Sequence, residues 1–164
     1  MAGEGAAFAK VLERIARDIL RQLDGLPDSV LNRPVPLPDA NTLYAIATHL
    51  VGSTEFWAVQ MATGRDVGRR RQAEFHATGD GGALIARYER LIGLVHDALD
   101  HLPDAAMDGI PPQPPAEYRS TGGLGETLTL RDCLLHAIEH GALHQGQIQI
   151  TRQLLADGVQ SPGR

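Results

Sequence analysis

The sequence lacks three features that are typical of secreted or membrane proteins: paired cysteines, a long apolar segment and the pattern of a signal peptide. Cys133 is the only cysteine among 164 residues, so no internal disulfide can form and a reducing compartment is favoured. No segment approaches the ~20 apolar residues of a membrane-spanning helix. Residues 1–10, MAGEGAAFAK, lack the cationic and then apolar order of a signal peptide. We therefore expect a cytoplasmic protein with no membrane partner.

Positive charge is also in short supply. The chain has 15 Lys and Arg against 20 Asp and Glu, a formal net charge of -5. A nucleic-acid-binding surface needs an excess of basic side chains over one face, and we expect no nucleic-acid partner. The run Arg69-Arg70-Arg71 is the exception, and we interpret it as part of a solvated polar connector between helices.

The apolar residues that are present recur every three or four positions in four segments. With 43% hydrophobic residues over 164 positions, the chain can bury a core as one domain, residues 1–164. The periodicity predicts amphipathic helices, and four of them predict an all-α four-helix bundle. The predicted helices span about residues 5–23, 42–63, 82–102 and 129–156.

Two long connections separate these helices. Residues 24–40 are rich in proline, and residues 103–128 in both proline and glycine, so neither segment can continue a helix. Thr129 and Asp132 form a near capping box at the start of the last helix. A loop as long as 103–128 inside a compact domain is usually functional or disordered.

The last helix contains the sequence HAIEHGALHQGQ, in which His136, His140 and His144 are spaced four apart. Residues four apart on a helix are separated by about 6 Å along the axis and about 40° around it, so either neighbouring pair can reach one ion, whereas His136 and His144 are about 12 Å apart. Helical angle places His140 and His144 on the inward stripe and His136 about 80° from it. A structural pair without metal also fits this spacing.

A third histidine, His49, lies among small and apolar residues of the second helix. One histidine from this helix and a pair from the last helix would make a three-nitrogen metal site with an open coordination position. The solvated interpretation is favoured for the other histidines, His76, His96 and His101. Cys133 is expected to be a small core residue rather than a ligand.

Three segments together resemble the DinB-like superfamily of four-helix metalloproteins. They are ATHLVGSTEFW, GRDVGRRRQAEF and HAIEHGALHQGQI. The resemblance covers about residues 5–156 and extends to the N-terminal domain of mycothiol-dependent maleylpyruvate isomerase. Its most specific element is His-x-x-x-His followed by Gly-Gln, here His140, His144, Gly146 and Gln147.

The resemblance implies an up-down-down-up bundle, a homodimer and a divalent metal, with zinc preferred and nickel as the alternative. Carried over by position, the metal ligands are His49, His140 and His144. The family commonly has arginine after the last ligand, where this chain has Gln145. Some relatives use a low-molecular-weight thiol (mycothiol, bacillithiol or glutathione) in transferase or isomerase reactions.

The leading hypothesis is therefore a metal-dependent transferase that joins such a thiol to an electrophilic substrate. The substrate would lie under the 103–128 loop, where Tyr118 and Arg119 are the nearest polar residues and are expected at the surface. One alternative is a metal-dependent hydrolase, although Glu55 and Glu139 fall about 100° or more from the neighbouring ligands on the helical wheel. The other is a non-catalytic, stress-associated metal-binding dimer. The sequence leaves the catalytic residues unassigned.

Overall fold

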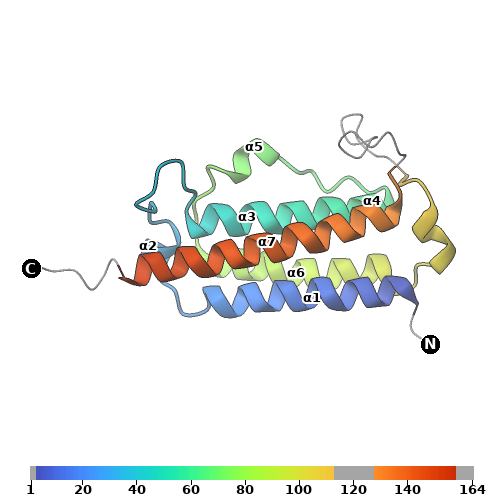
Figure 1. Ribbon diagram of the computed structural model, residues 1–164, viewed down its shortest axis with the longest axis horizontal. Coiled ribbons are helices and arrows are strands. Elements are labelled where there is room, and N and C mark those ends of the chain that lie inside the picture. The colour runs from blue at the N-terminus through green and yellow to red at the C-terminus, as the bar shows by residue number, and fades with distance from the viewer. Residues whose placement is uncertain (1–2, 113–127, 158–164) are drawn as a thin grey trace, which may run out of the picture.

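The computed structural model describes residues 3–112 and 128–157, and no β-strand occurs among them. Four long helical rods lie side by side along the molecule (Figure 1). They are α1 (Glu4–Leu23), a continuous rod over residues 43–63, α6 (Gly81–Leu99) and α7 (Leu130–Asp157). The predicted all-α four-helix bundle is confirmed.

The rod over residues 43–63 is not a uniform α-helix. It consists of α3 (Leu43–Thr54), the π-helical segment η1 (Glu55–Gln60) and the short α4 (Met61–Thr63). The sequence pattern predicts one α-helix here and does not indicate the wider turn. A π-helical turn within an α-helix often lies beside a functional site, and η1 follows the helix that carries His49.

Contacts between helix ends establish the relative directions of α1, α6 and α7. The Glu4 carboxylate at the start of α1 accepts a hydrogen bond from Arg131 at the start of α7 (2.8 Å). The backbone N of Glu4 donates to Asp104, just beyond the end of α6 (2.7 Å). At the other end of the bundle, the backbone N of Gly81 at the start of α6 donates to Asp28 in the link after α1 (2.8 Å). Figure 1 shows α1 and α7 running in one direction, and α3 and α6 in the other.

Because α3 and α6 run parallel, the chain between them must return along the bundle. Residues 64–80 make this crossover, and they carry the one-turn helix α5 (Arg71–Glu74) over α3 (Figure 1). The two remaining links join helices that run in opposite directions, α1 to α3 and α6 to α7, and these helices lie diagonally across the bundle from each other. The first contains α2 (Asp28–Leu31), and the second begins with the 3₁₀ turn η2 (Asp104–Asp108).

Side-chain caps explain where the helices begin. The Thr42 hydroxyl accepts from the backbone N of Ala45 (3.1 Å), and the Asp80 carboxylate accepts from Ala83 (2.7 Å). The capping box predicted for Thr129 and Asp132 is present, with reciprocal bonds of 2.9 and 3.2 Å. The third predicted helix ends earlier than expected, at Leu99 rather than near residue 102.

The core consists of the predicted apolar stripes. Buried positions on α1 and α6 recur at helical spacing: Leu12, Ile15, Ile19, Leu23, Leu84, Tyr88, Leu91 and Val95. Burying each large side chain contributes about 1.5–3 kcal/mol. Cys133 is fully buried, and burial raises the pKa of its thiol to about 12, so it is the small core residue that the sequence suggested. Within the described ranges, no helix is both long and apolar enough to cross a bilayer.

Candidate metal centre

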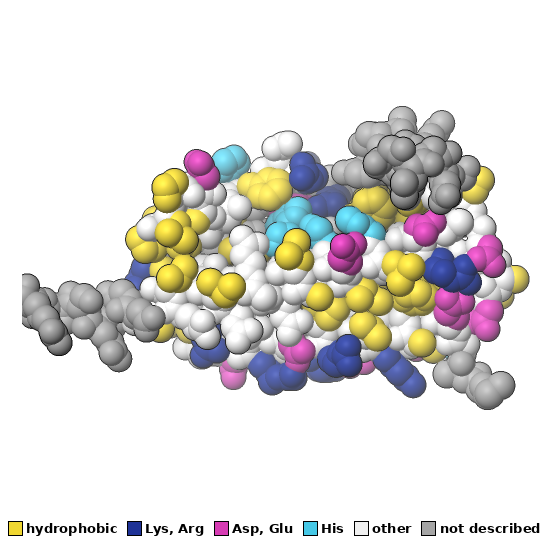
Figure 2. All heavy atoms as spheres, viewed as in Figure 1, with side chains coloured by type: hydrophobic (Ala, Val, Ile, Leu, Met, Phe, Trp, Pro, Cys, Tyr) yellow, Lys and Arg dark blue, Asp and Glu magenta, His cyan; other side chains and the backbone are white. Residues whose placement is uncertain are grey.

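Three imidazoles from two helices meet at one edge of the bundle. His49 comes from α3, and His140 and His144 come from α7. Nitrogen atoms of the three rings all lie within 4.8 Å of one another, so the cluster can hold a metal ion. Figure 2 shows cyan histidine side chains at the surface beside apolar side chains.

The arrangement follows from simple helix geometry. The i, i+4 spacing brings His140 and His144 onto one face of α7, with ring centroids 4.4 Å apart. Helix α3 packs against that face, and the ring centroid of His49 lies 5.1 Å from each of the other two. His49 is 5% exposed. His140 and His144 are only partly buried, so the pair lies at the rim of the bundle rather than within its apolar core.

The spacing of two nitrogens agrees with shared coordination. His49 Nε2 and His140 Nε2 are 3.3 Å apart. Two nitrogens at the zinc–nitrogen distance, arranged at a tetrahedral angle, would be separated by about 3.3 Å. Without an ion, the same contact requires one ring to carry its proton on Nε2 and donate it to the other.

Hydrogen bonds at Nδ1, the ring nitrogen that faces away from the cluster, orient the imidazoles of His49 and His144. His49 Nδ1 lies 2.8 Å from Glu74 Oε2, and His144 Nδ1 lies 2.7 Å from Gln147 Oε1. Both acceptors favour a proton on Nδ1, which leaves Nε2 with a free lone pair for a ligand. Gln147 belongs to the Gly-Gln element singled out in the sequence, and this contact gives it a physical role.

The local electrostatics favour neutral rings. Burial lowers the pKa of His140 to about 3, and repulsion from His144 and His49 adds to the effect. Burial also lowers the pKa of His144. The neutral form is the one that ligates metals. Burial by itself would raise the pKa of Glu74, but hydrogen bonds from His49 and Arg69 outweigh it and lower that pKa.

Glu74 and Arg69 are the residues near the site that the sequence did not reveal. Arg69 contacts the Glu74 carboxylate through two nitrogens, at 2.8 and 3.0 Å, and its side chain is 10% exposed. The expectation of a solvated basic run is therefore wrong for Arg69, because a buried carboxylate draws it inward. Arg70 and Arg71 are exposed. Neither spacing nor periodicity links a connector glutamate to a helix histidine 25 residues away.

His136 lies beside the cluster but outside it. Its ring packs against Trp57 of η1, with centroids 4.6 Å apart, and lies 5.6 Å from the ring of His140. The predicted position at the edge of the ligand pair agrees with these contacts. Burial lowers the pKa of His136.

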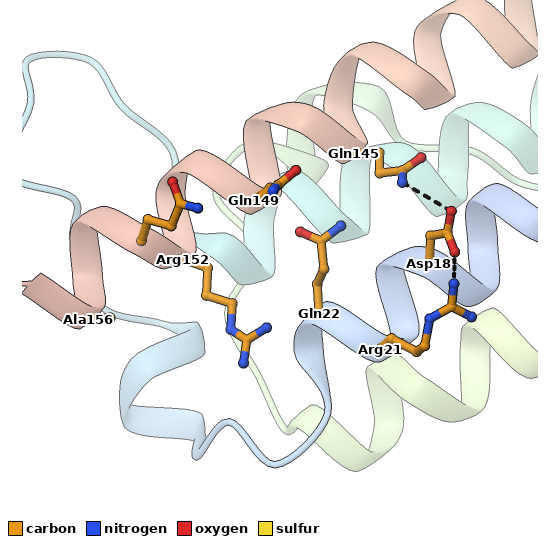
Figure 3. Close-up of a pocket in the computed structure, with 8 residues that line it drawn as sticks. Asp18, Arg21, Gln22, Gln145, Gln149, Arg152 and Ala156 are labelled. Atoms are coloured by element: carbon orange, nitrogen blue, oxygen red, sulfur yellow. Dashed lines mark hydrogen bonds and ion pairs between the residues drawn. The ribbon is translucent and has the colours of Figure 1, made fainter.

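Gln145 points away from the three histidines. Its amide donates to Asp18 of α1 at 3.1 Å (Figure 3). Together with Gln22 and Arg152, these residues line an open groove of about 630 Å³ between α1 and α7. Gln145 therefore contributes to this groove rather than to the histidine cluster.

The remaining candidates lie elsewhere. Glu55 pairs with Arg87 of α6 at 2.5 Å, and Glu139 is exposed. His76 and His101 are exposed, as expected for solvated residues, whereas His96 is bound by two carboxylates. Tyr118 and Arg119 lie outside the described residues.

Comparisons with known proteins place the chain in a family. The model of the DinB superfamily matches residues 12–148. A crystal structure of a conserved protein from Enterococcus faecalis shares the fold, with a TM-score of 0.70 and 14% identity over 96% of this chain and 99% of that one. The search of curated proteins finds no match. Since the family model spans most of the bundle, including all three clustered histidines, the chain belongs to the DinB superfamily.

Proposed function

We propose that this protein binds one divalent metal ion through His49, His140 and His144, with zinc as the first candidate and nickel as the second. The observation that carries the proposal is the convergence of three imidazoles whose nitrogens lie within 4.8 Å, two of them 3.3 Å apart. Three protein ligands leave a coordination position open, as in catalytic zinc sites.

Elemental analysis of the purified protein tests this proposal. We expect about one metal per chain in the wild type and a large loss in His49→Ala and His144→Ala. His136→Ala is the matched control, because His136 lies on the same helix and contacts His140 without joining the cluster. Undiminished metal in His144→Ala would overturn the assignment.

We further propose that the site serves a transferase reaction in which a low-molecular-weight thiol attacks an electrophilic substrate. A bound divalent ion supplies positive charge that favours the thiolate, the nucleophilic form of a thiol. Two aromatic side chains of the protein lie beside histidines of this region and cover part of it. Phe75 stacks on His49 at 4.7 Å, and Trp57 packs beside His136.

The state of the nearby carboxylates favours a transferase over a hydrolase. Many metal-dependent hydrolases place a carboxylate base beside the metal to take a proton from its bound water. Glu74 is held by His49 and Arg69, and Glu55 is held by Arg87. A thiol substrate would bring its own nucleophile and would need no such base from the chain once it is ionised.

Conjugation assays separate these reactions. The metal-loaded protein is given an electrophilic dye with mycothiol, bacillithiol or glutathione in turn, and His144→Ala serves as the inactive control. We expect conjugation with one of the thiols. Hydrolysis of activated esters without any thiol, together with no conjugation, would support the hydrolase instead.

A non-catalytic dimer is the second candidate, and one surface feature favours association. Helix α7 carries large apolar side chains on its outer face, with exposures of 51% for Leu135, 70% for Leu143 and 60% for Ile150. Figure 2 shows apolar side chains along this side of the molecule. We propose that a second copy of the chain covers this face, forming a homodimer in either case.

A further inference from the structure

Glu74 is a buried carboxylate that is hydrogen-bonded to His49 and to Arg69. It is 5% exposed and lies 2.8 Å from His49 Nδ1. A buried charge is costly unless it is paired and hydrogen-bonded. Here Arg69 donates from Nε to Oε1 and from Nη2 to Oε2 of Glu74, and Oε2 also faces His49 Nδ1.

The contact determines which nitrogen of His49 is available. A carboxylate accepts, so His49 Nδ1 carries a proton, and in the neutral ring that ligates metals Nε2 then keeps its lone pair. Nε2 is the atom that lies 3.3 Å from His140 Nε2. Glu74 therefore selects both the tautomer and the ring orientation that present His49 to the other two histidines.

The carboxylate is held tightly against α3. An added Cβ at Gly52 would lie 2.4 Å from Glu74 Oε1, so only glycine leaves room for it. Arg69 is in turn held by the aromatic surface of the rod, with its guanidinium 5.6 Å from the ring centroid of Phe56. Phe75, the residue after Glu74, covers the His49 ring.

We propose that residues 69–75 form a positioning clasp, in which Arg69 holds Glu74 and Glu74 orients His49, so that metal binding and docking of the crossover on α3 stabilise each other. The clasp rests on the proposed metal centre and adds a function for the crossover. Glu74 and Arg69 are positioning residues, because they act through His49 rather than on a ligand of the site.

Metal affinity measured by competition with a chromophoric chelator tests the clasp. We expect Glu74→Gln and Arg69→Gln to weaken zinc binding by roughly 10–100-fold, the usual effect of removing a partner of a metal-bound histidine. Arg70→Gln is the matched control, since it removes the same charge from an exposed neighbour and should leave affinity within about twofold. Affinities equal to wild type in both variants would overturn the clasp.

Two measurements on the wild-type chain remain informative if a variant does not fold. Long-range ¹H–¹⁵N correlation in the metal-free protein should place the His49 proton on Nδ1. A proton on Nε2 would contradict the proposal. Hydrogen exchange should slow across residues 69–77 on adding zinc, because coupling between binding and docking is reciprocal. Unchanged exchange there would also contradict it.

The two proposals fail in different ways. If wild type and His144→Ala bind zinc equally well, the metal centre itself is wrong. If His49→Ala and His144→Ala lose zinc while Glu74→Gln and Arg69→Gln keep it, the centre stands and the clasp is wrong.

Discussion

At the scale of single residues, Gly52 shows how closely the crossover approaches α3. Alanine is normally better than glycine inside a helix by about 1 kcal/mol. At this position its Cβ would meet Glu74 Oε1 at 2.4 Å and Arg87 Nη2 at 3.4 Å. We expect Gly52→Ala to lower the free energy of unfolding in urea and to weaken zinc binding, because Glu74 must move.

Gly93 of α6 provides the control for that prediction. It lies inside a helix, and an added Cβ there would have no atom within 4 Å. Gly93→Ala should therefore raise the free energy of unfolding by about 0.5–1 kcal/mol and leave zinc affinity unchanged. A gain of the same size in Gly52→Ala would show that Glu74 is not held where the structure places it.

At the scale of elements, His96 joins α6 to α1. Its Nε2 lies 2.9 Å from Glu13 of α1, and its Nδ1 lies 3.0 Å from Asp100. Hydrogen bonds to Glu13 and then to Asp100 raise the pKa of His96, and bonds from Arg17 and then His96 lower the pKa of Glu13. The imidazolium therefore acts as a link between two packed helices.

These directions give a pH window for stability. A histidine with a raised folded pKa stabilises fully below its unfolded value of about 6.5 and loses that contribution as pH rises through the folded value. Glu13, with a lowered pKa, contributes fully above its unfolded value of about 4.3 and loses that contribution as pH falls through its folded pKa. We expect His96→Gln to cost at most about 1 kcal/mol at pH 5.5, given the partial exposure of both groups.

Urea unfolding of the wild type and His96→Gln at pH 5.5 and pH 9 measures this difference. The two curves should converge at the higher pH. His101→Gln, which alters an exposed histidine just beyond the same helix, should match the wild type at both values. A pH-independent cost for His96→Gln would indicate a packing role rather than an ionic one.

At the scale of the whole molecule, metal binding should stabilise the bundle, because the three proposed ligands come from α3 and α7. A ligand that binds only the folded state at 100 times its Kd adds about 2.7 kcal/mol. For a domain of this size, that corresponds to a rise in Tm of roughly 5–10 °C. Thermal unfolding with zinc and with a chelator measures it.

His49→Ala should lose this rise while His136→Ala keeps it. Equal stabilisation in both variants would mean that the ion binds elsewhere. The comparison is made against each variant's own metal-free Tm, since removing the buried His49 changes packing as well as ligation.

The proposed homodimer also belongs to this scale. Placing charges on the outer face of α7 by Leu143→Glu with Ile150→Glu should convert a dimer to a monomer in sedimentation, because a buried unpaired charge is costly. Leu37→Glu is the control, since Leu37 is also exposed, at 53%, but lies in the link before α3. If the wild-type protein sediments as a monomer, the proposed homodimer is wrong.

The sequence by itself determined the helices and the chemistry they could carry. Apolar spacing of three and four residues is enough to locate the rods, because a helix turns once in 3.6 residues whatever its surroundings. The same local rule selected His140 and His144 and placed His136 at their edge. The prediction of His49 as the third member needed only a histidine on a facing helix, and the structure brings its ring to the pair.

Only the tertiary structure decided which distant residues support that cluster. Glu74 reaches His49 because α3 and α6 are parallel, which sends residues 64–80 back along the bundle. His96 reaches Glu13, 83 positions away in the chain, because α6 packs against α1. Helical periodicity is a property of neighbours in the chain, whereas these contacts depend on helix direction and packing, which involve the whole bundle at once.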